Sequence, residues 1–395
     1  MLASIRILAK PSAARHANRA IVYPSFGNPS EVLTAVTYPD LSSPPPKSLN
    51  VRYILSPINP ADINVIENKY HSKPSPVKTL AEGTVHAFSE PHFVGGNEGL
   101  AEVIEVGKGV EGYKVGDRVV LTKQQSGTWA SARTLHEDDV LKVPEEFSDV
   151  NAATITVNPP TAYNMLHSFV NLRPGDLVIQ NGANSAVGQA VIQIASRRGL
   201  RTLNFVRNRN DIISLKESLH SLGADHVYTY DDLKNKETVQ QIKSTITHKG
   251  ASLMLNCVSG DPTKDMTRFL AEGATLVSYG AMSKQPLSLP TSLFIFRDLV
   301  CRGFWQTKWY ADHSREERED LMQTLAELKV SSCADDVDKT TDVLSNDAQQ
   351  LQEPEHEILT LKGAASDQEV AQQVREIISK MQGGRYGKKA LLKFE

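Results

Sequence analysis

The clearest alternation of apolar and polar positions lies between Leu177 and Gly199. Leu177-Val178-Ile179 is a short apolar run that leads into Gln180-Asn181-Gly182, a pattern typical of a buried parallel strand running into a turn. After the turn, apolar residues recur at the spacing of one helix face: Val187, Ala190, Val191, Ile194 and Ala195. The pattern therefore predicts a strand, a glycine-containing turn and a helix.

The turn from Gly182 to Gly188 has the chemistry of an anion site. Free backbone N–H groups and the positive end of the helix dipole can hold a pyrophosphate there. Ala183 and Ser185 stand where a strict G-x-G-x-x-G pattern has glycines. Taken alone, the turn is equally compatible with a tight strand–helix connection in any α/β protein.

The next apolar run, Arg201 to Val206, ends in the sequence Arg207-Asn208-Arg209-Asn210. A site for NAD places a carboxylate near the end of this strand, where it accepts hydrogen bonds from the ribose 2′-hydroxyl. Here the first carboxylate is Asp211, and guanidinium groups suit a phosphate dianion better than a neutral hydroxyl. The sequence favours NADP over NAD, and solvated loop charges are the alternative interpretation.

The remaining pattern predicts an α/β fold with two domains. Short β segments separated by Gly and Pro predict a compact, partly closed β-barrel, with its clearest strands at 20–23, 49–55, 100–106 and 117–121. A helix is expected at 152–169. Strands and helices then alternate as in a doubly wound parallel sheet, with further strands at 225–228, 253–258, 274–279 and 299–304.

The C-terminal part is expected to return to the first domain. A helical stretch begins near Asp312, an exposed acidic insertion is predicted at 331–357, and β-like segments at 358–361 and 390–394 flank a helix near 368–381. The expected domains are a leader at 1–20, a barrel domain at 21–165, a nucleotide-binding domain at 166–310, and the returning segment at 311–395.

Composition narrows the function classes. The 395 residues are 40% hydrophobic, enough for two cores, and the formal net charge of −3 implies neither a nucleic-acid partner nor a polybasic membrane surface. No apolar run is long enough to cross a bilayer. Cys257, Cys301 and Cys333 form no C-x-x-C pair, which argues against a disulfide framework and a cysteine-based zinc site.

The first twenty residues differ in composition from the rest. They carry Arg6, Lys10, Arg15 and Arg19, and no acidic residue precedes Glu31. This is typical of a mitochondrial transit peptide with cleavage between Arg15 and Ala20, and a disordered basic tail is the alternative.

Several short motifs together resemble one family. They are Ile58 to Asn64 (INPADIN), Gly95 to Gly99 (GGNEG), Val115 to Val119 (VGDRV), Val157-Asn158-Pro159, Ala162-Tyr163, Val178 to Asn181 (VIQN), Val187 to Ala190 (VGQA), Leu255 to Val258 (LNCV) and Arg302 to Trp305 (RGFW). The chain resembles the mitochondrial 2-enoyl thioester reductases, the enoyl-acyl-carrier-protein reductases of the medium-chain dehydrogenase/reductase superfamily. The resemblance implies a GroES-like barrel beside a Rossmann-type sheet, NADPH as cofactor, and a homodimer in the mitochondrial matrix. The implied substrate is a trans-2-enoyl thioester carried by acyl-carrier protein or coenzyme A.

The same resemblance implies the site residues. Tyr70 matches the position of the family's catalytic tyrosine, a proton donor, although a tyrosine closing a polar helix is more often a packing residue. The positions matching cofactor contacts are Asn158, Asn184, Ser185, Ala186, Val187, Arg207, Asn208, Arg209, Tyr279, Gly280, Ala281, Met282, Phe304, Trp305, Gln306 and Lys388. Lys389 leaves the register of Lys388 open, and Trp305 is either a wall of the acyl pocket or a core residue.

The chain departs from the zinc alcohol dehydrogenases. Asn97 stands where their Gly-His-Glu motif supplies a metal-ligating histidine, and no cysteine precedes Cys257. His71, His86 and His92 are irregularly spaced in one proline-rich loop, which is either part of the acyl entrance or a surface insertion. We therefore expect a metal-free enzyme. The rival functions are a zinc-free NADPH:quinone oxidoreductase and an NADPH-binding protein without turnover.

Overall fold

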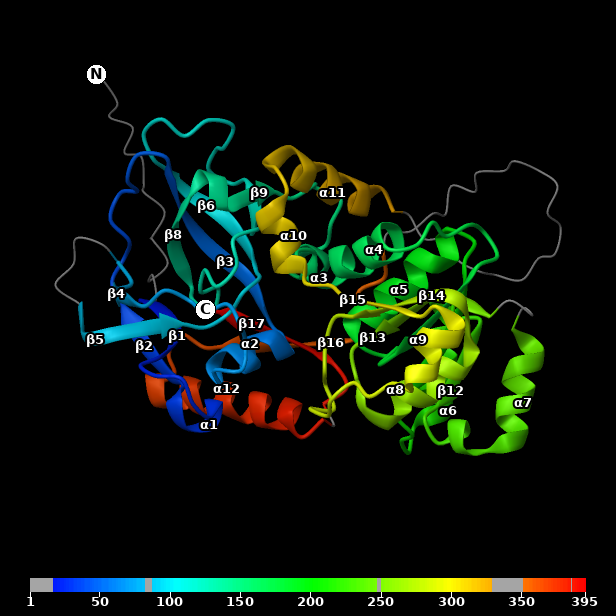
Figure 1. Cartoon of the computed structure of the whole chain (residues 1–395). Helices are drawn as coiled ribbons and strands as arrows, with labels where there is room; N and C mark the ends of the chain where they lie inside the picture. The colour runs from blue at the N-terminus through cyan, green and yellow to red at the C-terminus, as the bar shows by residue number, and fades with distance from the viewer. Residues whose placement is uncertain (1–16, 82–86, 247–249, 329–350, 385) are drawn as a thin grey trace, which may run out of the picture. The chain divides into compact units, whose positions relative to one another are not determined.

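A computed structural model describes residues 17–81, 87–246, 250–328, 351–384 and 386–395 of the chain (Figure 1). The contacts within it divide the chain into two compact units. Unit 1 comprises the described residues up to Val119 together with Gln124–Val140 and Glu357–Glu395, and unit 2 comprises Val120–Lys123 and Leu141–His356. The described residues of 141–165, 311–328 and 351–356 group with the second unit, whereas the sequence analysis expected them in the barrel domain.

Unit 2 is built on a six-stranded sheet in the order β12-β11-β10-β13-β14-β15. The strands are β10 (Leu177–Asn181), β11 (Arg201–Val206), β12 (His226–Thr229), β13 (Ala251–Asn256), β14 (Leu270–Ser278) and β15 (Val300–Gly303). Every neighbouring pair is parallel. The chain runs outward from β10 through β11 to β12 and then returns to the other side of β10 at β13. The topological switch point therefore lies between β10 and β13, which is where open α/β sheets bind ligands.

The predicted strand–turn–helix is present at the centre of this sheet. All residues of β10 are buried, as expected for a parallel strand covered on both faces. Helix α5 (Ala186–Arg197) buries Ala190, Val191 and Ile194 in a core with Met165 and Leu253, among others. The spacing of the apolar residues was sufficient to predict α5 because its apolar face packs against the core along the whole helix.

The helices of unit 2 correct the prediction at two places. They are α3 (Asp149–Thr154), α4 (Asn158–Ser168), α5, α6 (Ile212–Ser221), α7 (Lys236–Thr245), α8 (Gly260–Met266), α9 (Thr291–Arg297), α10 (Gln306–Asp312) and α11 (Arg315–Glu327), with short 3₁₀ turns η2 (Asp232–Lys234) and η3 (Thr267–Phe269). The single helix expected at 152–169 is two helices, because Pro159 and Pro160 start α4, where a missing N–H is tolerated. Helix α10, which follows β15 after two residues, was not predicted.

The predicted exposed insertion at 331–357 lies outside the described residues as far as position 350. Its described end is fixed to unit 2. Leu351 is buried in the same core as α5, and the N–H of Gln352 donates to Gln193 Oε1 at 2.8 Å. Ser148 Oγ donates to Glu353 at 2.5 Å. Leu351 is therefore an exception to the predicted exposure, whereas Gln352, Glu353 and Glu355 are exposed as expected.

Unit 1 is largely antiparallel β structure. One sheet has the order β2-β1-β5-β4, and a seven-stranded sheet has the order β16-β17-β3-β6-β7-β9 with β8 paired to β3. The strands are β1 (Asn18–Tyr23), β2 (Thr34–Tyr38), β3 (Ser48–Ile58), β4 (Val77–Thr79), β5 (Ala87–Val94), β6 (Leu100–Val106), β7 (Arg118–Leu121), β8 (Ala132–His136), β9 (Val140–Lys142), β16 (His356–Leu361) and β17 (Lys389–Phe394). Helices α1 (Pro29–Val32), α2 (Pro60–Ile66) and α12 (Asp367–Gln382) and the turn η1 (Glu137–Asp139) complete it.

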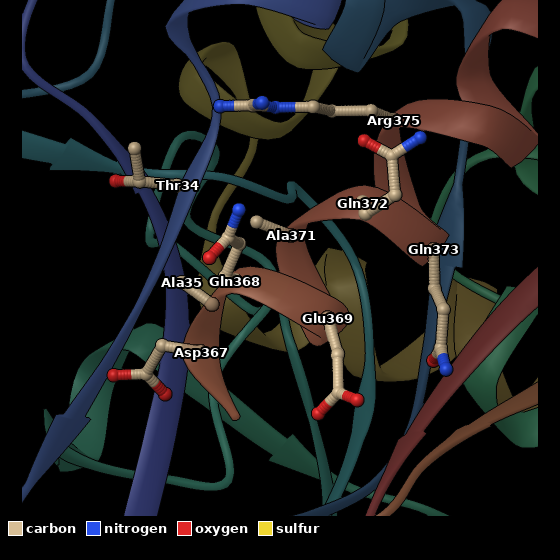
Figure 2. A pocket seen from close by; sticks show the side chains of 9 residues that line it. All are labelled: Thr34, Ala35, Asp367, Gln368, Glu369, Ala371, Gln372, Gln373 and Arg375. Atoms are coloured by element: carbon tan, nitrogen blue, oxygen red, sulfur yellow. The ribbon is translucent and has the colours of Figure 1, made fainter. Parts of the chain in front are cut away.

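Helix α12 closes the core of unit 1. Its Ser366 and Glu369 form a capping box, and its apolar face, including Val370 and Val374, packs with Ile21 of β1. Outside this core, β2 and α12 line an open hollow of about 750 Å³ that Figure 2 shows. Its side chains are mainly amides and charged groups, and two of the charged groups, Asp367 and Arg375, bond to β2 and to the residue before it. Arg375, for example, donates to the carbonyl of Leu33 at 2.8 Å.

Strand β1 begins within the predicted leader. Asn18 to Ala20 pair with β2, and Ala20 is fully buried. The Arg19 guanidinium lies 2.8 Å from Asp367 and donates to the carbonyl of Ala365 at 2.7 Å. A leader reaching residue 20 would remove half of this strand. Among the described residues, none of the helices is both long and apolar enough to span a bilayer.

Candidate active site

The structure brings the predicted cofactor residues of unit 2 to one edge of its sheet. The segments 184–187, 207–209, 279–282 and 304–306 follow directly on β10, β11, β14 and β15, respectively. Because these strands are parallel, their carboxyl ends lie at the same edge. The four segments form the rim of one site at the switch point.

The geometry of the turn after β10 explains why it has glycine at positions 182 and 188 and serine at position 185. Gly182 has a φ of +59°, and a Cβ there would lie 2.6 Å from Cys257 Sγ. A Cβ on Gly188 would lie 2.6 Å from the carbonyl oxygen of Ala183, so both positions need glycine. Position 185 needs a cap instead, because Ser185 Oγ accepts the N–H of Gly188 at 3.1 Å. The remaining N–H groups of the first turn of α5 are left for an anion.

The segment after β11 carries exposed positive charge. Arg209 Nε and Nη2 each lie 2.5 Å from an oxygen of Asp211. This pairing raises the pKa of Arg209 and lowers the pKa of Asp211. Asn208 Nδ2 donates to Asp231 at 3.3 Å, and the Arg207 side chain is exposed. The guanidinium groups of Arg207 and Arg209 lie on one short loop and suit a 2′-phosphate. Arg209 would then bind both this phosphate and Asp211.

The first residues of α4 and α10 supply buried amides. Asn158 and Gln306 are 8% and 6% exposed, and Asn164 Nδ2 donates to Gln306 Oε1 at 3.1 Å. Asn158 Nδ2 and Gln306 Nε2 have no hydrogen-bond partner within the described part of the chain. Buried donors are costly when left unpaired, so these two atoms fit a polar ligand such as a carboxamide.

The aromatic residues of this edge differ in burial. Burial is the main cause that raises the pKa of Tyr279 well above its usual range. Phe304 is half-buried, with its ring edge-on to Phe169 at 6.0 Å between centroids, and Trp305 is also half-buried. Met282 is 58% exposed. The phenol of Tyr279 is thus neutral at physiological pH, and Met282 remains accessible.

Tyr70 belongs to unit 1, in the turn that follows α2. The N–H of Lys69 donates to the carbonyl of Asn64 at 2.8 Å, and Asn68 adopts a left-handed conformation with a φ of +59°. Glu67 holds the turn from both sides, through Lys69 Nζ at 2.6 Å and Gln382 Nε2 at 2.8 Å. Tyr70 is half-buried. Its approach to the residues of unit 2 stays a prediction.

The beginning of α2 contains a buried charged cluster that the sequence analysis missed. The N–H of Asn59 donates to Asp62 at 2.7 Å, and Asn59 Nδ2 donates to Glu98 at 2.7 Å. Lys389 Nζ donates to Asn59 Oδ1 and, at 3.4 Å, to Glu98. Burial raises the pKa of Asp62 to about 7. The hydrogen bond from the Asn59 N–H and the charge of Lys389 lower this pKa, whereas the charge of Glu98 raises it. The only signal in the sequence was the polar run in INPADIN.

Lys388 and Lys389 differ in burial. Lys389 is 8% exposed, and its ammonium is engaged by the cluster at the beginning of α2. Lys388 is exposed. Lys388 therefore stays the predicted cofactor contact in unit 1, and Lys389 connects β17 to α2.

The position of the missing zinc ligand has a structural role. Asn97 Oδ1 accepts the N–H of Gln125 at 2.6 Å. His92 stacks on Phe88 with centroids 4.3 Å apart, and His86 lies outside the described residues. Within the part of the chain that the structure describes, no group of three or more His, Cys, Asp or Glu side chains is placed to hold a metal.

Treatment with a strong chelator is expected to leave activity unchanged, because Asn97 offers no imidazole and its amide oxygen is already occupied. The measurement is turnover before and after dialysis against the chelator, with the zinc content determined in parallel. Stoichiometric zinc whose removal abolishes turnover would overturn the metal-free prediction.

This fold and site define a two-domain dehydrogenase of the medium-chain type. Residues 45–145 match the family model of the alcohol dehydrogenase GroES-like domain, and residues 186–327 match that of the zinc-binding dehydrogenases. The chain belongs to the mitochondrial enoyl-[acyl-carrier-protein] reductase family. It is 42% identical over 310 residues to that enzyme from Homo sapiens, covering 78% of both chains.

Solved structures agree with this assignment. The mitochondrial 2-enoyl thioester reductase Etr1p/Etr2p heterodimer from Candida tropicalis superimposes with a TM-score of 0.81 at 30% identity, over 95% of this chain and 99% of that one. The complex of Etr1p with NADP and crotonyl-CoA gives a TM-score of 0.80 at 30% identity, over the same shares of both chains.

Proposed function

We propose that this protein reduces trans-2-enoyl thioesters to saturated acyl thioesters with NADPH. The observation that carries the proposal is its membership of a family whose human member, 42% identical, is named enoyl-[acyl-carrier-protein] reductase. The complex of Etr1p with NADP and crotonyl-CoA supports both the cofactor and the substrate class. The two arginines after β11 and the amide nitrogens of Asn158 and Gln306, which have no partner among the described residues, are consistent with NADPH at the edge of the sheet.

The chemistry assigns different tasks to the two units. NADPH, when bound, supplies the hydride that adds to the β-carbon of the enoyl group. Charge then develops on the thioester oxygen, and the α-carbon must receive a proton. Tyr70 donates this proton or a hydrogen bond to the oxygen, because a neutral phenol can do both. In unit 2, Asn184 to Val187 bind the pyrophosphate, Arg207 to Arg209 bind the 2′-phosphate, and Asn158, Tyr279 to Met282 and Phe304 to Gln306 line the nicotinamide end. Lys388 of unit 1 provides a further positive charge.

The direct test is NADPH oxidation with two acceptors. The proposal expects rapid oxidation with crotonyl-CoA or an enoyl-acyl-carrier protein and little with a quinone. Rapid turnover of the quinone alone would support the rival oxidoreductase, and stoichiometric NADPH binding without turnover of any enoyl thioester would support a binding protein.

The protein acts in mitochondria, as its relatives' names state, and we place it in the matrix with a leader that ends before Asn18. Arg6, Lys10 and Arg15 lie in the predicted leader, outside the described residues, whereas Arg19 belongs to β1. Substitutions of Arg6, Lys10 and Arg15 should therefore affect import, whereas a substitution of Arg19 should affect folding.

A reporter fused to residues 1–17 is expected to enter mitochondria, and replacing Arg6, Lys10 and Arg15 by Glu is expected to abolish import, because transit peptides need a basic, acid-free sequence. Fluorescence microscopy with a matrix protease-protection assay measures both. Arg19→Glu in the whole protein is the control, which should reduce stability and leave import intact. A cytosolic native fusion would contradict the leader.

The edge strand of unit 2 supports a homodimer. Within the described residues, β15 pairs with β14 only, and Cys301 to Gly303 are exposed. The preceding helix α9 exposes three apolar side chains, Phe294 (42%), Ile295 (66%) and Phe296 (76%). An open strand edge beside an apolar patch is typical of an interface. We propose that β15 of two copies pair there.

Ile295→Glu combined with Phe296→Glu is expected to convert the dimer to a monomer, because two charges would be buried in the interface. Light scattering coupled to size-exclusion chromatography measures the mass. Ile213→Glu, at an exposed position of α6, is the matched control and should stay dimeric. A monomeric native protein, or a double variant that remains dimeric, would refute this interface.

A further inference from the structure

Two buried asparagines occupy the switch point of the unit 2 sheet without belonging to the predicted cofactor contacts. Asn181 ends β10 and Asn256 ends β13, and both are fully buried. Asn181 Nδ2 donates to Asn256 Oδ1 at 2.8 Å and to Thr263 Oγ1 at 2.9 Å. Asparagine is unusual in strands covered on both faces, where apolar residues are the rule.

Asn256 orders the loop that follows β13. Its Oδ1 accepts the N–H of Val258 at 3.2 Å and the N–H of Ser259 at 2.9 Å. Its Nδ2 donates to Ser278 Oγ at 2.9 Å, at the end of β14. Ser259 is held at a φ of +66°, a conformation that non-glycine residues rarely adopt unless their surroundings impose it.

This loop is in turn the support for a predicted cofactor segment. The N–H of Tyr279 donates to the carbonyl of Asn256 at 2.9 Å, and the N–H of Met282 donates to the carbonyl of Cys257 at 2.8 Å. A Cβ on Gly280 would lie 3.2 Å from the Cys257 carbonyl, so the two segments are in close contact. The backbone of 279–282 therefore follows that of 256–258.

The turn at 182–188, proposed to bind the pyrophosphate, also contacts the loop after β13. The N–H of Cys257 donates to Asn181 Oδ1 at 2.8 Å, and the Cys257 thiol fills the space that a side chain at Gly182 would need. Burial raises the pKa of Cys257 to about 11, so the thiol is neutral and acts by packing. Asn181 thus connects the turn at Gly182 to the loop that supports Tyr279 to Met282.

From this geometry we infer that the Asn181–Asn256 amide pair is the positioning element of the NADPH site, which sets the pyrophosphate turn and the 279–282 segment relative to each other. The inference rests on the proposed function. Neither asparagine needs to touch the cofactor. Within the described residues, the side chains of the pair form hydrogen bonds with each other, with residues 257–259, with Thr263 and with Ser278, and not with the loop after β11. We therefore expect the pair to position the pyrophosphate and nicotinamide portions and to leave the 2′-phosphate contacts alone.

The test compares two ligands in direct binding measurements. Asn256→Leu and Asn181→Leu are expected to raise the Kd for NADP⁺ at least tenfold, measured by isothermal titration calorimetry. The Kd for 2′,5′-ADP, which lacks the nicotinamide portion, should rise less than threefold. Asn181→Asp should behave like Asn181→Leu, because it keeps the acceptor for Cys257 but replaces the donor toward Asn256 by a second acceptor.

Asn204→Leu is the matched control for a purely structural effect. Asn204 is equally buried in the neighbouring strand β11 and bonds to Gln180 at 2.8 Å and Thr202 at 2.9 Å, away from the 256–260 loop. It should lower the melting temperature as much as the other variants and leave the Kd for NADP⁺ within twofold of the native value. Equal losses of affinity in all variants, or none, would overturn the positioning role. Failure of the native protein to bind NADP⁺ would refute the proposed function instead. If the leucine variants fail to fold, Asn181→Asp, which keeps the acceptor for Cys257 and loses the donor toward Asn256 and Thr263, should still weaken NADP⁺ more than 2′,5′-ADP.

Discussion

Tyr70→Phe is expected to lower kcat by roughly two to four orders of magnitude, the usual contribution of a positioned acid–base group. The phenol acts mainly in the transition state, so the KM for the enoyl thioester should change much less than kcat. The ring that remains keeps its packing in the turn after α2, so folding and NADP⁺ affinity should be close to native. Steady-state kinetics with crotonyl-CoA and a calorimetric Kd measure these quantities.

Tyr113→Phe is the matched control in the same unit. Its hydroxyl donates to the carbonyl of Val140 at 2.8 Å and has no predicted catalytic task. This variant should retain nearly native kcat. Near-normal kcat in Tyr70→Phe, or a collapsed fold, would remove Tyr70 from the mechanism and direct attention to Tyr163 or a bound water as the proton source.

Replacing Arg207 and Arg209 by Ala is the prediction with the second-largest effect. Loss of charge-assisted bonds to the 2′-phosphate should cost about 1.5–3 kcal/mol, or roughly a ten- to hundredfold higher KM for NADPH. The weak use of NADH, which lacks that phosphate, should hardly change. Parallel kinetics with both cofactors measure the difference.

Arg315→Ala provides the control for the loss of a surface arginine. Arg315 of α11 forms an exposed ion pair with Glu319 at 2.8 Å, comparable to that between Arg209 and Asp211. Its KM values for NADPH and NADH should both be native. Equal losses with the two cofactors in the Arg207 and Arg209 variant would contradict the 2′-phosphate assignment.

The sequence predicted the centre of unit 2 well because its signals are local. The apolar run of β10, the glycines that the turn requires and the apolar face of α5 all follow from residues within about one helix length. The resemblance pointed to the four rim segments, and the parallel strands of the sheet place them at one edge. The preference for NADP came from the two arginines after β11, and the medium-chain fold followed from the resemblance.

The features that the sequence did not reveal depend on contacts between distant residues. Lys389 reaches the beginning of α2 only because β17 pairs with β3. The hydrogen bond between Asn181 and Asn256 likewise forms only because β13 lies beside β10 in the sheet. Asn18 to Ala20 read as part of a basic leader because charge composition alone does not show that Arg19 meets Asp367 on α12. The break between α3 and α4 is different, because Pro159 and Pro160 mark it locally in the sequence.

The most direct test of the central claim follows the hydride itself. The protein is incubated with crotonyl-CoA and NADPH that carries deuterium at the transferred C4 position, and the product is examined by mass spectrometry and NMR. We expect butyryl-CoA with one deuterium at the β-carbon and an unlabelled proton from water at the α-carbon, formed in equal amount to NADP⁺. NADPH oxidation without butyryl-CoA, or butyryl-CoA without deuterium at the β-carbon, would contradict the central claim.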